Sequence, residues 1–364
     1  MTALPSDALV FYGATGDLAY KKIFPSLQAM VKRGRLDVPV IGVAKSGWKR
    51  SGVFHARSGE AAMRRTVTAM VLGLGLLMAH AQSVAGDGVV ASGAAVEKLA
   101  GGFQFTEGPT CDAEGNLFFT DQPDDRILKW SAEGGLSTFL HPAGRANGMY
   151  FDPQGNLIAC ADERTALWSI APDRQVTVIT SEYNGKPLNG PNDVWVRPDG
   201  ALYVTDPFYQ RPWWTHDRMP QDGQHVYFLS ADRKQLVRVA DDLEKPNGII
   251  GTPDGKTLYV ADIGAGKTYR FDMAPDGHLT RKTLFIERGS DGMTLDNEGN
   301  LYLTGKGVSV FDKTGRQIEQ INVPGEEWTA NVSFCAKDRQ TLFMTAGTGL
   351  YRINMRVTGA NVAK

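Results

Sequence analysis

The sequence predicts an all-β protein: a six-bladed β-propeller, preceded by an orphan βαβ fragment and an internal segment with the features of a signal peptide. Six segments from residue 87 onward can be superposed, with 40 to 55 residues between successive starts. Each segment has a strand, a turn that in five of the six contains Gly, and a returning strand, which is typical of a propeller blade. Residues 1–50 and 63–86 do not share this repeat.

Composition restricts the partners. The 364 residues carry a formal net charge of −1, with Lys/Arg and Asp/Glu evenly mixed. This balance argues against nucleic acid or an anionic membrane as the main partner, and the sequence predicts no particular oligomeric state. Three cysteines, Cys111, Cys160 and Cys335, do not form a disulfide framework, so we expect buried small hydrophobic residues.

Residues 1–50 have the pattern of a strand, a Gly-rich turn, a helix and a second strand. Apolar runs at 8–12 and 38–43 flank the turn and an amphipathic stretch over 23–31. The run resembles the amino terminus of glucose-6-phosphate dehydrogenase, which implies a phosphate-binding turn with Lys45 near a 2′-phosphate. Because one βαβ unit cannot bury both faces of its sheet, we predict a fragment without dehydrogenase activity.

Residues 51–86 are predicted to be a linker followed by a secretory signal. A basic start at 63–65, an apolar run at 66–78 and the small-residue site Ala79-His80-Ala81 form its three parts. The apolar run is shorter than the roughly 20 residues that span a bilayer, so we expect no stable membrane anchor. Translation from Met63 would give a periplasmic or secreted protein. A buried apolar helix is the alternative.

Each of the six repeats opens on a polar residue at one register. The first strand of a propeller blade lines the central channel, so these residues should converge at one mouth. Carboxylates among amides form a hard-oxygen cage that suits Ca²⁺ or Mg²⁺. Turn formation is the alternative, but it does not predict one register in all six repeats. The residues are Glu107, Asn147, Asn192, Asn247, Asp291 and Asn331.

Other features are expected near this mouth. The third repeat, with 55 residues, includes the aromatic loop 207–216, which predicts a lid or substrate wall, or else a packing loop. A strand at 96–99 should complete the last blade beside 342–357 and close the ring. Acidic residues at the ends of four second strands either support metal ligands or cap loops. These residues are Asp121, Asp162, Asp206 and Asp262.

Four motifs resemble the gluconolactonase, senescence marker protein and luciferin-regenerating enzyme family, over about residues 95–357. They are Thr106-Glu107-Gly108-Pro109, Gly190-Pro191-Asn192-Asp193-Val194, Pro246-Asn247-Gly248 and Ser290-Asp291-Gly292-Met293. The resemblance implies that Glu107, Asn192, Asn247 and Asp291 hold one divalent metal, usually Ca²⁺, with Mg²⁺, Mn²⁺ or Zn²⁺ as alternatives. It also implies that Asp291 is the catalytic base or nucleophile. We assign substrate binding to Asn147, Arg145, Trp213 and His216.

The predicted function is metal-dependent opening of a sugar lactone by residues 87–364. The metal would polarise the carbonyl, and Asp291 would take a proton from the attacking water. No G-x-S-x-G elbow competes with this chemistry. The alternatives are hydrolysis of other esters or organophosphates at the same metal, or a non-catalytic propeller that serves as a binding scaffold.

Overall fold

The computed structural model describes residues 9–12, 40–43, 53–54 and 88–360. The chain divides into two compact units, Met1–Ala85 and Gly86–Lys364. The first unit contains the parallel strands β1 (Leu9–Tyr12) and β2 (Val40–Val43), and β3 (Val53–Phe54) antiparallel to β2. β1 and β2 coincide with the two predicted apolar runs, whereas β3 lies in the segment predicted to be a linker. The helix predicted over 23–31 and the signal-like segment lie outside the described residues.

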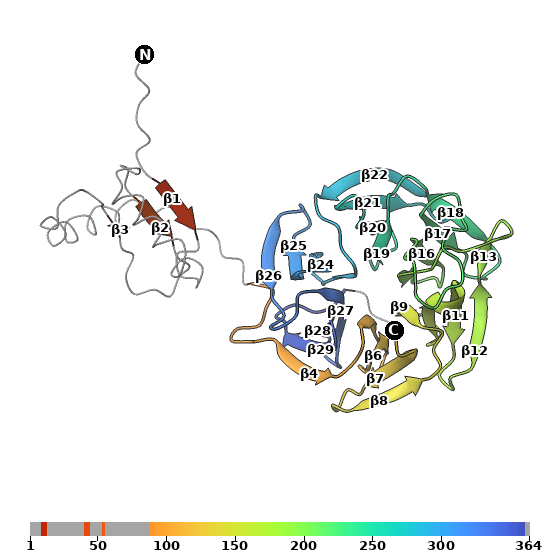
Figure 1. Cartoon of the computed structure of the whole chain (residues 1–364), viewed down its shortest axis with the longest axis horizontal. Helices are drawn as coiled ribbons and strands as arrows, with labels where there is room; N and C mark the ends of the chain where they lie inside the picture. The colour runs from red at the N-terminus through yellow and green to blue at the C-terminus, as the bar shows by residue number, and fades with distance from the viewer. Residues whose placement is uncertain (1–8, 13–39, 44–52, 55–87, 361–364) are drawn as a thin grey trace, which may run out of the picture. The chain divides into compact units, whose positions relative to one another are not determined.

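The second unit is a ring of six four-stranded blades around a channel, which confirms the predicted propeller (Figure 1). The pairing of Gly305 with Thr329 joins blades 5 and 6 into one continuous sheet. The innermost strands of all six blades line the channel. Blade 1 has β5 (Thr106–Cys111), β6 (Leu117–Asp121), β7 (Arg126–Trp130) and β8 (Leu136–Leu140). Blade 2 has β9 (Ala146–Phe151), β10 (Leu157–Ala161), β11 (Ala166–Ile170) and β12 (Val176–Thr180). Blade 3 has β15 (Val194–Val196), β16 (Leu202–Asp206), β17 (His225–Leu229) and β18 (Leu236–Ala240).

The remaining blades follow the same plan. Blade 4 has β19 (Pro246–Gly251), β20 (Thr257–Asp262), β21 (Lys267–Met273) and β22 (Leu279–Ile286). Blade 5 has β23 (Met293–Leu295), β24 (Leu301–Gly305), β25 (Gly307–Phe311) and β26 (Gln317–Ile321). Blade 6 has β27 (Thr329–Cys335), β28 (Thr341–Ala346), β29 (Gly349–Asn354) and the early strand β4 (Glu97–Gly101). A small hairpin, β13 (Glu182–Tyr183) with β14 (Lys186–Pro187), lies between blades 2 and 3, and a 3-10 helix, Asp162–Arg164, connects β10 to β11 within blade 2.

The repeated turns explain why each first strand reverses into the second. In blade 2, Gly155 takes a φ of 81° in the turn between β9 and β10, a conformation that glycine adopts without steric cost. Blade 6 has no glycine at this turn, and Arg339 takes the left-handed conformation instead, with a φ of 56°. The sequence pattern of the sixth repeat is weaker for this reason, although its strands form in the same register.

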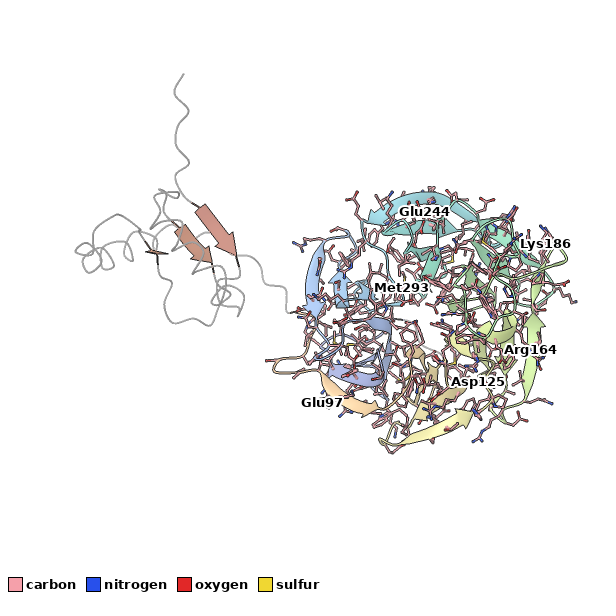
Figure 2. All side chains as sticks on the ribbon, viewed as in Figure 1. Glu97, Asp125, Arg164, Lys186, Glu244 and Met293 are labelled. Atoms are coloured by element: carbon pink, nitrogen blue, oxygen red, sulfur yellow. A yellow bond between two sulfur atoms is a disulfide. The ribbon has the colours of Figure 1, made fainter. Side chains whose placement is uncertain are left out.

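The ring closes through blade 6, which combines strands from both ends of the propeller. Strand β4 pairs antiparallel with β29, and Leu350 lies opposite Ala100. The prediction that an early strand completes the last blade is therefore confirmed. Side chains fill the space between neighbouring blades (Figure 2), and one buried cluster joins Ile158 of blade 2 to Val194 and Leu202 of blade 3. In the described part of the chain, no helix is long and apolar enough to cross a bilayer.

The expectation for the cysteines is wrong at two positions. Cys111 on β5 and Cys335 on β27 form a disulfide, with Cα atoms 5.3 Å apart and a sequence separation of 224. Ring closure places the inner strands of blades 1 and 6 side by side, and the number of cysteines alone could not reveal this neighbourhood. Cys160 is a free, buried thiol, as expected.

Candidate metal centre and channel mouth

The six polar residues that open the repeats lie together at one end of the channel. Asn331 Nδ2 on β27 donates to Glu107 Oε2 on β5 at 3.0 Å, across the closure of the ring. Asn247 Nδ2 on β19 donates to Asp291 Oδ1 at 2.8 Å, and Asp291 immediately precedes blade 5. Side chains that are far apart in sequence are therefore in direct contact at this mouth.

Glycines beside these residues allow the blades to approach one another. The N–H of Gly148 donates to the carbonyl of Asn192 at 2.8 Å. A Cβ on Gly148 would lie 2.6 Å from that carbonyl oxygen, and a Cβ on Gly248 would lie 2.5 Å from the carbonyl oxygen of Asp291. Atoms do not approach this closely without displacing the backbone. The glycine that follows the polar residue in four repeats thus reflects close packing between neighbouring blades. These glycines are Gly108, Gly148, Gly248 and Gly292.

The six polar residues form a ring around the mouth, and the two carboxylates of this ring differ in accessibility. Glu107 is 2% exposed, whereas Asp291 is only half-buried. Burial raises the pKa of Glu107 well above its usual range, and the nearby carboxylates of Asp291 and Asp193 raise it further. Burial also raises the pKa of Asp291, while hydrogen bonds from Trp328 and Asn247 oppose this shift. Of the six ring residues, Asp291 is the one that solvent can reach.

The amides complete the ring. Asn192 is 5% exposed and Asn147 is 4% exposed. The side chains of these two residues make no hydrogen bond to any described residue, so their oxygens are available to a ligand. Asn247 Nδ2 also donates to the hydroxyl of Tyr209 at 3.0 Å. Among residues 88–360, no group of three or more His, Cys, Asp or Glu is arranged to hold a metal. The expected set differs in kind, because it contains two carboxylates and two amides.

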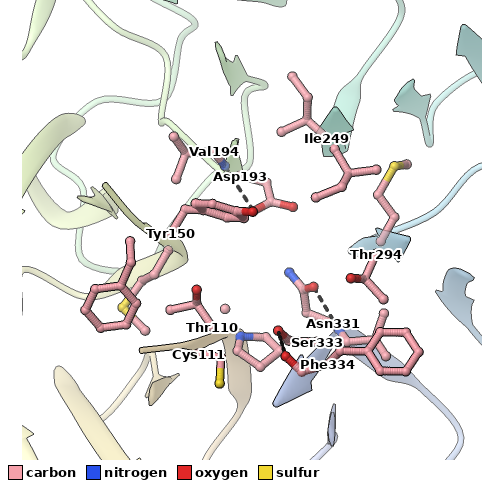
Figure 3. A pocket seen from close by; sticks show the side chains of 17 residues that line it. Thr110, Cys111, Tyr150, Asp193, Val194, Ile249, Thr294, Asn331, Ser333 and Phe334 are labelled. Carbon is pink, nitrogen blue, oxygen red and sulfur yellow. Dashed lines mark hydrogen bonds between the residues drawn. The ribbon is translucent and has the colours of Figure 1, made fainter. Parts of the chain in front are cut away.

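Asp193 is a buried acid that the sequence reasoning missed. Its carboxylate points into the cavity that continues the channel beyond the ring, and the amide of Asn331 points into the same cavity (Figure 3). Burial raises the pKa of Asp193 to about 8, so this carboxyl is mostly protonated at neutral pH. β15 begins only at Val194, so strand alternation does not decide where Asp193 points. Its position beside Asn192 was the available signal.

The acidic residues at the ends of the second strands act mainly as loop caps. Asp206 accepts hydrogen bonds from the backbone N–H groups of Asn189 and Gly190, at 2.9 and 2.8 Å. Asp262 accepts those of Glu244 and Lys245, each at 2.9 Å. Each cap holds the segment that leads into the polar residue of its own blade, Asn192 for Asp206 and Asn247 for Asp262. The cap of Asp121 on the N–H groups of Gln104 and Phe105 repeats this arrangement.

Asp162 departs from this pattern. It pairs with Arg211 of the aromatic loop, with 2.8 Å between Asp162 Oδ2 and Arg211 Nε. Burial raises the pKa of Asp162 to about 6, against the effect of Arg211. Because Asp162 belongs to blade 2 and Arg211 to blade 3, this ion pair fastens the loop across two blades.

The aromatic loop reaches the mouth, and two predicted substrate-binding residues meet there. The guanidinium of Arg145 lies 4.7 Å from the ring centroid of Trp213. The Trp213 indole N–H is buried and has no hydrogen-bond partner among the described residues. Tyr209 brings the loop to the ring through its contact with Asn247. The loop therefore forms a wall beside the candidate ligands.

His216 lies within the loop rather than at the ring. Its imidazole stacks on Trp214, with ring centroids 4.9 Å apart and planes inclined by 17°. Trp214 Nε1 donates to the carbonyl of Asp162 at 2.8 Å, which anchors the pair on blade 2. Among the described residues, His216 makes no hydrogen bond or ring contact with any of the six polar residues at the mouth. The structure thus groups Arg145 with Trp213, whereas His216 packs on Trp214.

Trp328 is a second residue that the sequence reasoning missed. Its indole N–H donates to Asp291 Oδ2 at 2.8 Å, and its side chain is 42% exposed. Trp328 lies in the segment between β26 and β27, outside any repeated register. A single tryptophan in a connecting segment carries no signal of this kind in the sequence.

Comparison with known proteins supports both predicted resemblances. The model of the SMP-30/Gluconolactonase/LRE-like region matches residues 105–348. The model of the glucose-6-phosphate dehydrogenase NAD binding domain matches residues 10–87, which extends beyond the predicted fragment into the signal-like segment. The gluconolactonase of Zymomonas mobilis is 28% identical over 302 residues, covering 75% of this chain and 85% of that protein.

Two solved structures share the propeller. A gluconolactonase from Xanthomonas campestris, described as important in glucose secondary metabolic pathways, is 31% identical with a TM-score of 0.69, over 73% of this chain and 91% of that one. Regucalcin from Agrobacterium tumefaciens, a calcium-binding protein, gives 21% identity and a TM-score of 0.60, over 71% and 92% of the two chains, which is a likeness of fold. Because the first family model spans more than half of the sequence, the chain belongs to the SMP-30/gluconolactonase/LRE-like family.

Proposed function

We propose that the propeller is a metal-dependent lactonase that opens a sugar lactone at the channel mouth. The observation that carries this proposal is the ring itself. A buried Glu107 and a half-buried Asp291 lie among amides of neighbouring blades, beside an aromatic wall. The gluconolactonases among the relatives support the same substrate class. A binding scaffold would not need to concentrate acids at one mouth.

The residues present fit a divalent cation. Burial raises the pKa of both Glu107 and Asp291, and the nearby carboxylate of Asp291 raises that of Glu107 further, so a cation between them would favour their charged forms. The donors are all oxygens from carboxylate and amide groups, which Ca²⁺ prefers. Glu107, Asn192, Asn247 and Asp291 would hold it, with Mg²⁺, Mn²⁺ and Zn²⁺ as alternatives to Ca²⁺. When bound, the cation supplies Lewis-acid polarisation of the lactone carbonyl.

The residues of the chain supply binding and proton transfer. Arg145, Trp213 and Asn147 would border the lactone, and the wall formed by Tyr209 would exclude bulk water. Asp291 is half-buried, so it can reach a water molecule and accept its proton. The water oxygen then bonds to the carbonyl carbon. The bond from that carbon to the ring oxygen breaks, and the ring oxygen takes the proton, which yields the open hydroxy acid.

The test is hydrolysis of glucono-1,5-lactone, followed by release of acid and corrected for the spontaneous reaction. The protein is treated with a chelator and then supplied with Ca²⁺, Mg²⁺, Mn²⁺ or Zn²⁺. We expect chelation to abolish the rate and one cation to restore it, while Asp291→Asn stays inactive. Asp254→Asn, an exposed acid in the β19–β20 turn, is the matched control. Full activity of both the chelated protein and Asp291→Asn would disprove the proposal. Simple esters and an organophosphate assayed in parallel test the alternative substrates.

We further propose that the propeller works in the periplasm or outside the cell. The Cys111–Cys335 disulfide supports this location, because such bonds persist in oxidising compartments. Residues 63–81 would direct export and be removed after Ala81. Mass spectrometry of the protein from the native cells would decide. A mature chain that begins at Gln82 in the periplasmic fraction is expected, and an intact chain confined to the cytoplasm would contradict export.

A further inference from the structure

Trp328 combines two properties that other described tryptophans do not combine. Its indole Nε1–H donates to Asp291 Oδ2 at 2.8 Å. The side chain is nevertheless 42% exposed, whereas Trp195 in the core is 1% exposed. One edge of the indole therefore contacts the candidate base, while much of the ring is open to solvent at the channel mouth.

Neighbouring groups hold this ring in place. A Cβ on Gly305 would lie 3.8 Å from the Trp328 ring and 3.9 Å from the guanidinium of Arg288, so the two groups border the same small space. Two residues before Trp328, Glu326 Oε1 accepts a hydrogen bond from the hydroxyl of Tyr351 at 2.6 Å. This bond fastens the segment to blade 6. The segment that carries Trp328 is therefore anchored two residues away from the exposed indole.

We propose that Trp328 positions the Asp291 carboxylate through its N–H and receives the carbohydrate ring of the substrate on its exposed face. This inference rests on the lactonase function proposed above. The indole is uncharged, so its hydrogen bond orients Oδ2 without placing a second charge beside it. The other oxygen, Oδ1, accepts a hydrogen bond from Asn247 and therefore lies on the side of the candidate metal ligands.

The exposed face indicates the substrate class. A six-membered sugar lactone has an apolar face of C–H groups and a rim of hydroxyls. An aromatic face beside a polar group, here the guanidinium of Arg288, is complementary to both. A small lactone without hydroxyls has too little surface to gain from this contact. We therefore expect preference for pyranose-type aldonolactones over unsubstituted small lactones.

Two variants separate the two roles. Trp328→Phe keeps an aromatic face but removes the donor, and Trp328→Ala removes both. On glucono-1,5-lactone and γ-butyrolactone alike, we expect both variants to lower kcat about fivefold, because the hydrogen bond to a charged carboxylate is lost. Trp328→Ala should also raise KM for gluconolactone about tenfold and leave KM for γ-butyrolactone unchanged. Trp328→Phe should change either KM less than about twofold.

Binding of gluconate, the inert product, gives a readout that does not depend on turnover. The affinity for gluconate, measured by isothermal titration calorimetry, should fall about tenfold in Trp328→Ala and less than about twofold in Trp328→Phe. Trp130→Phe makes the same chemical change at a remote site. Trp130 pairs with Leu117 at one end of blade 1, while Asp121 pairs with Arg126 at the mouth end. This control should leave every constant unchanged, and thermal unfolding verifies that all variants fold.

The outcomes distinguish the roles from each other and from the proposed function. A wild-type kcat in Trp328→Phe would overturn the positioning role. Equal changes in KM for the two lactones in Trp328→Ala would overturn the role in sugar binding. If the wild-type protein hydrolysed neither lactone, the proposed function would fail. Gluconate affinity would then still decide whether Trp328 receives a carbohydrate, and equal affinity in wild type and Trp328→Ala would refute it.

Discussion

Reduction of the Cys111–Cys335 disulfide should destabilise the propeller, because it removes the covalent link between blades 1 and 6. The bond joins β5 of blade 1 to β27 of blade 6, across 224 residues of sequence. In the chain-entropy model, a cross-link over this separation lowers the entropy of the unfolded chain by the equivalent of about 5 kcal/mol at 25 °C. Measured effects are commonly about 2–4 kcal/mol. We therefore expect reduction to lower the free energy of unfolding by about 2–5 kcal/mol.

This loss converts into a measurable shift of the unfolding temperature. An unfolding entropy of about 2.1 cal/mol/K per residue gives roughly 0.6 kcal/mol/K for a propeller of about 270 residues. The expected decrease in Tm is therefore about 3–8 °C. The assay is calorimetric unfolding of the oxidised protein and of the same protein reduced while unfolded and then refolded with reductant. Mass spectrometry verifies the thiol state of each sample.

The double variant Cys111→Ala/Cys335→Ala is the control. Reductant should not change its Tm, because the remaining described cysteine, Cys160, is already a free thiol. The reasoning would be refuted if fully reduced and fully oxidised wild-type protein unfolded within about 1 °C of each other. In that case the pairing of β4 with β29 and the hydrogen bonds between blades 1 and 6 would be sufficient to hold the ring closed.

Three further predictions concern the ring, a loop cap and the amino-terminal unit. Gly248→Ala should destabilise the protein by about 1–3 kcal/mol in urea unfolding and lower the lactonase rate, because the new Cβ would meet the backbone of Asp291. The control Gly88→Ala, which has open space around it, should change neither the stability nor the rate. Burial, and to a smaller extent the nearby carboxylate of Asp162, raises the pKa of Asp206 to about 7. The contribution of Asp206 protonation to the stability of the fold is therefore fully present below about pH 4 and is lost as the pH rises through about 7. Asp206→Asn should therefore lose less stability than wild type between pH 5 and pH 8, and equal losses would contradict the shift. A chain beginning at Gln82 should match the full chain in lactonase rate, and saturable NADP binding by the full chain would show a function for the first unit.

The repeated parts of the structure were predictable from sequence, and so was the early strand β4 that completes the last blade, whereas side-chain contacts that depend on ring closure or on a connecting segment were not. Glu107 and Asp291 could be placed because six repeats fix one register, and strands at one register of a propeller face one channel. Cys111 and Cys335 escaped prediction as a pair, since their contact depends on closure of the ring between its first and last blades. Prediction also failed to single out Trp328, which lies in a connecting segment whose path no repeat specifies.

The glycines beside the six polar residues fix the spacing of the reactive groups, whereas other segments form the surface that selects the substrate. Gly148 and Gly248 set the distance between neighbouring blades through main-chain packing, so the aperture around Asp291 does not depend on which polar side chains surround it. The rim is built differently, from the segment after β16 and the segment before β27, and neither takes part in the blade repeat. Substitutions and insertions at the rim could therefore change the accepted substrate while the spacing of the reactive groups stays constant. Such a division would allow related propellers to diversify by exchanging loops around a centre of fixed dimensions.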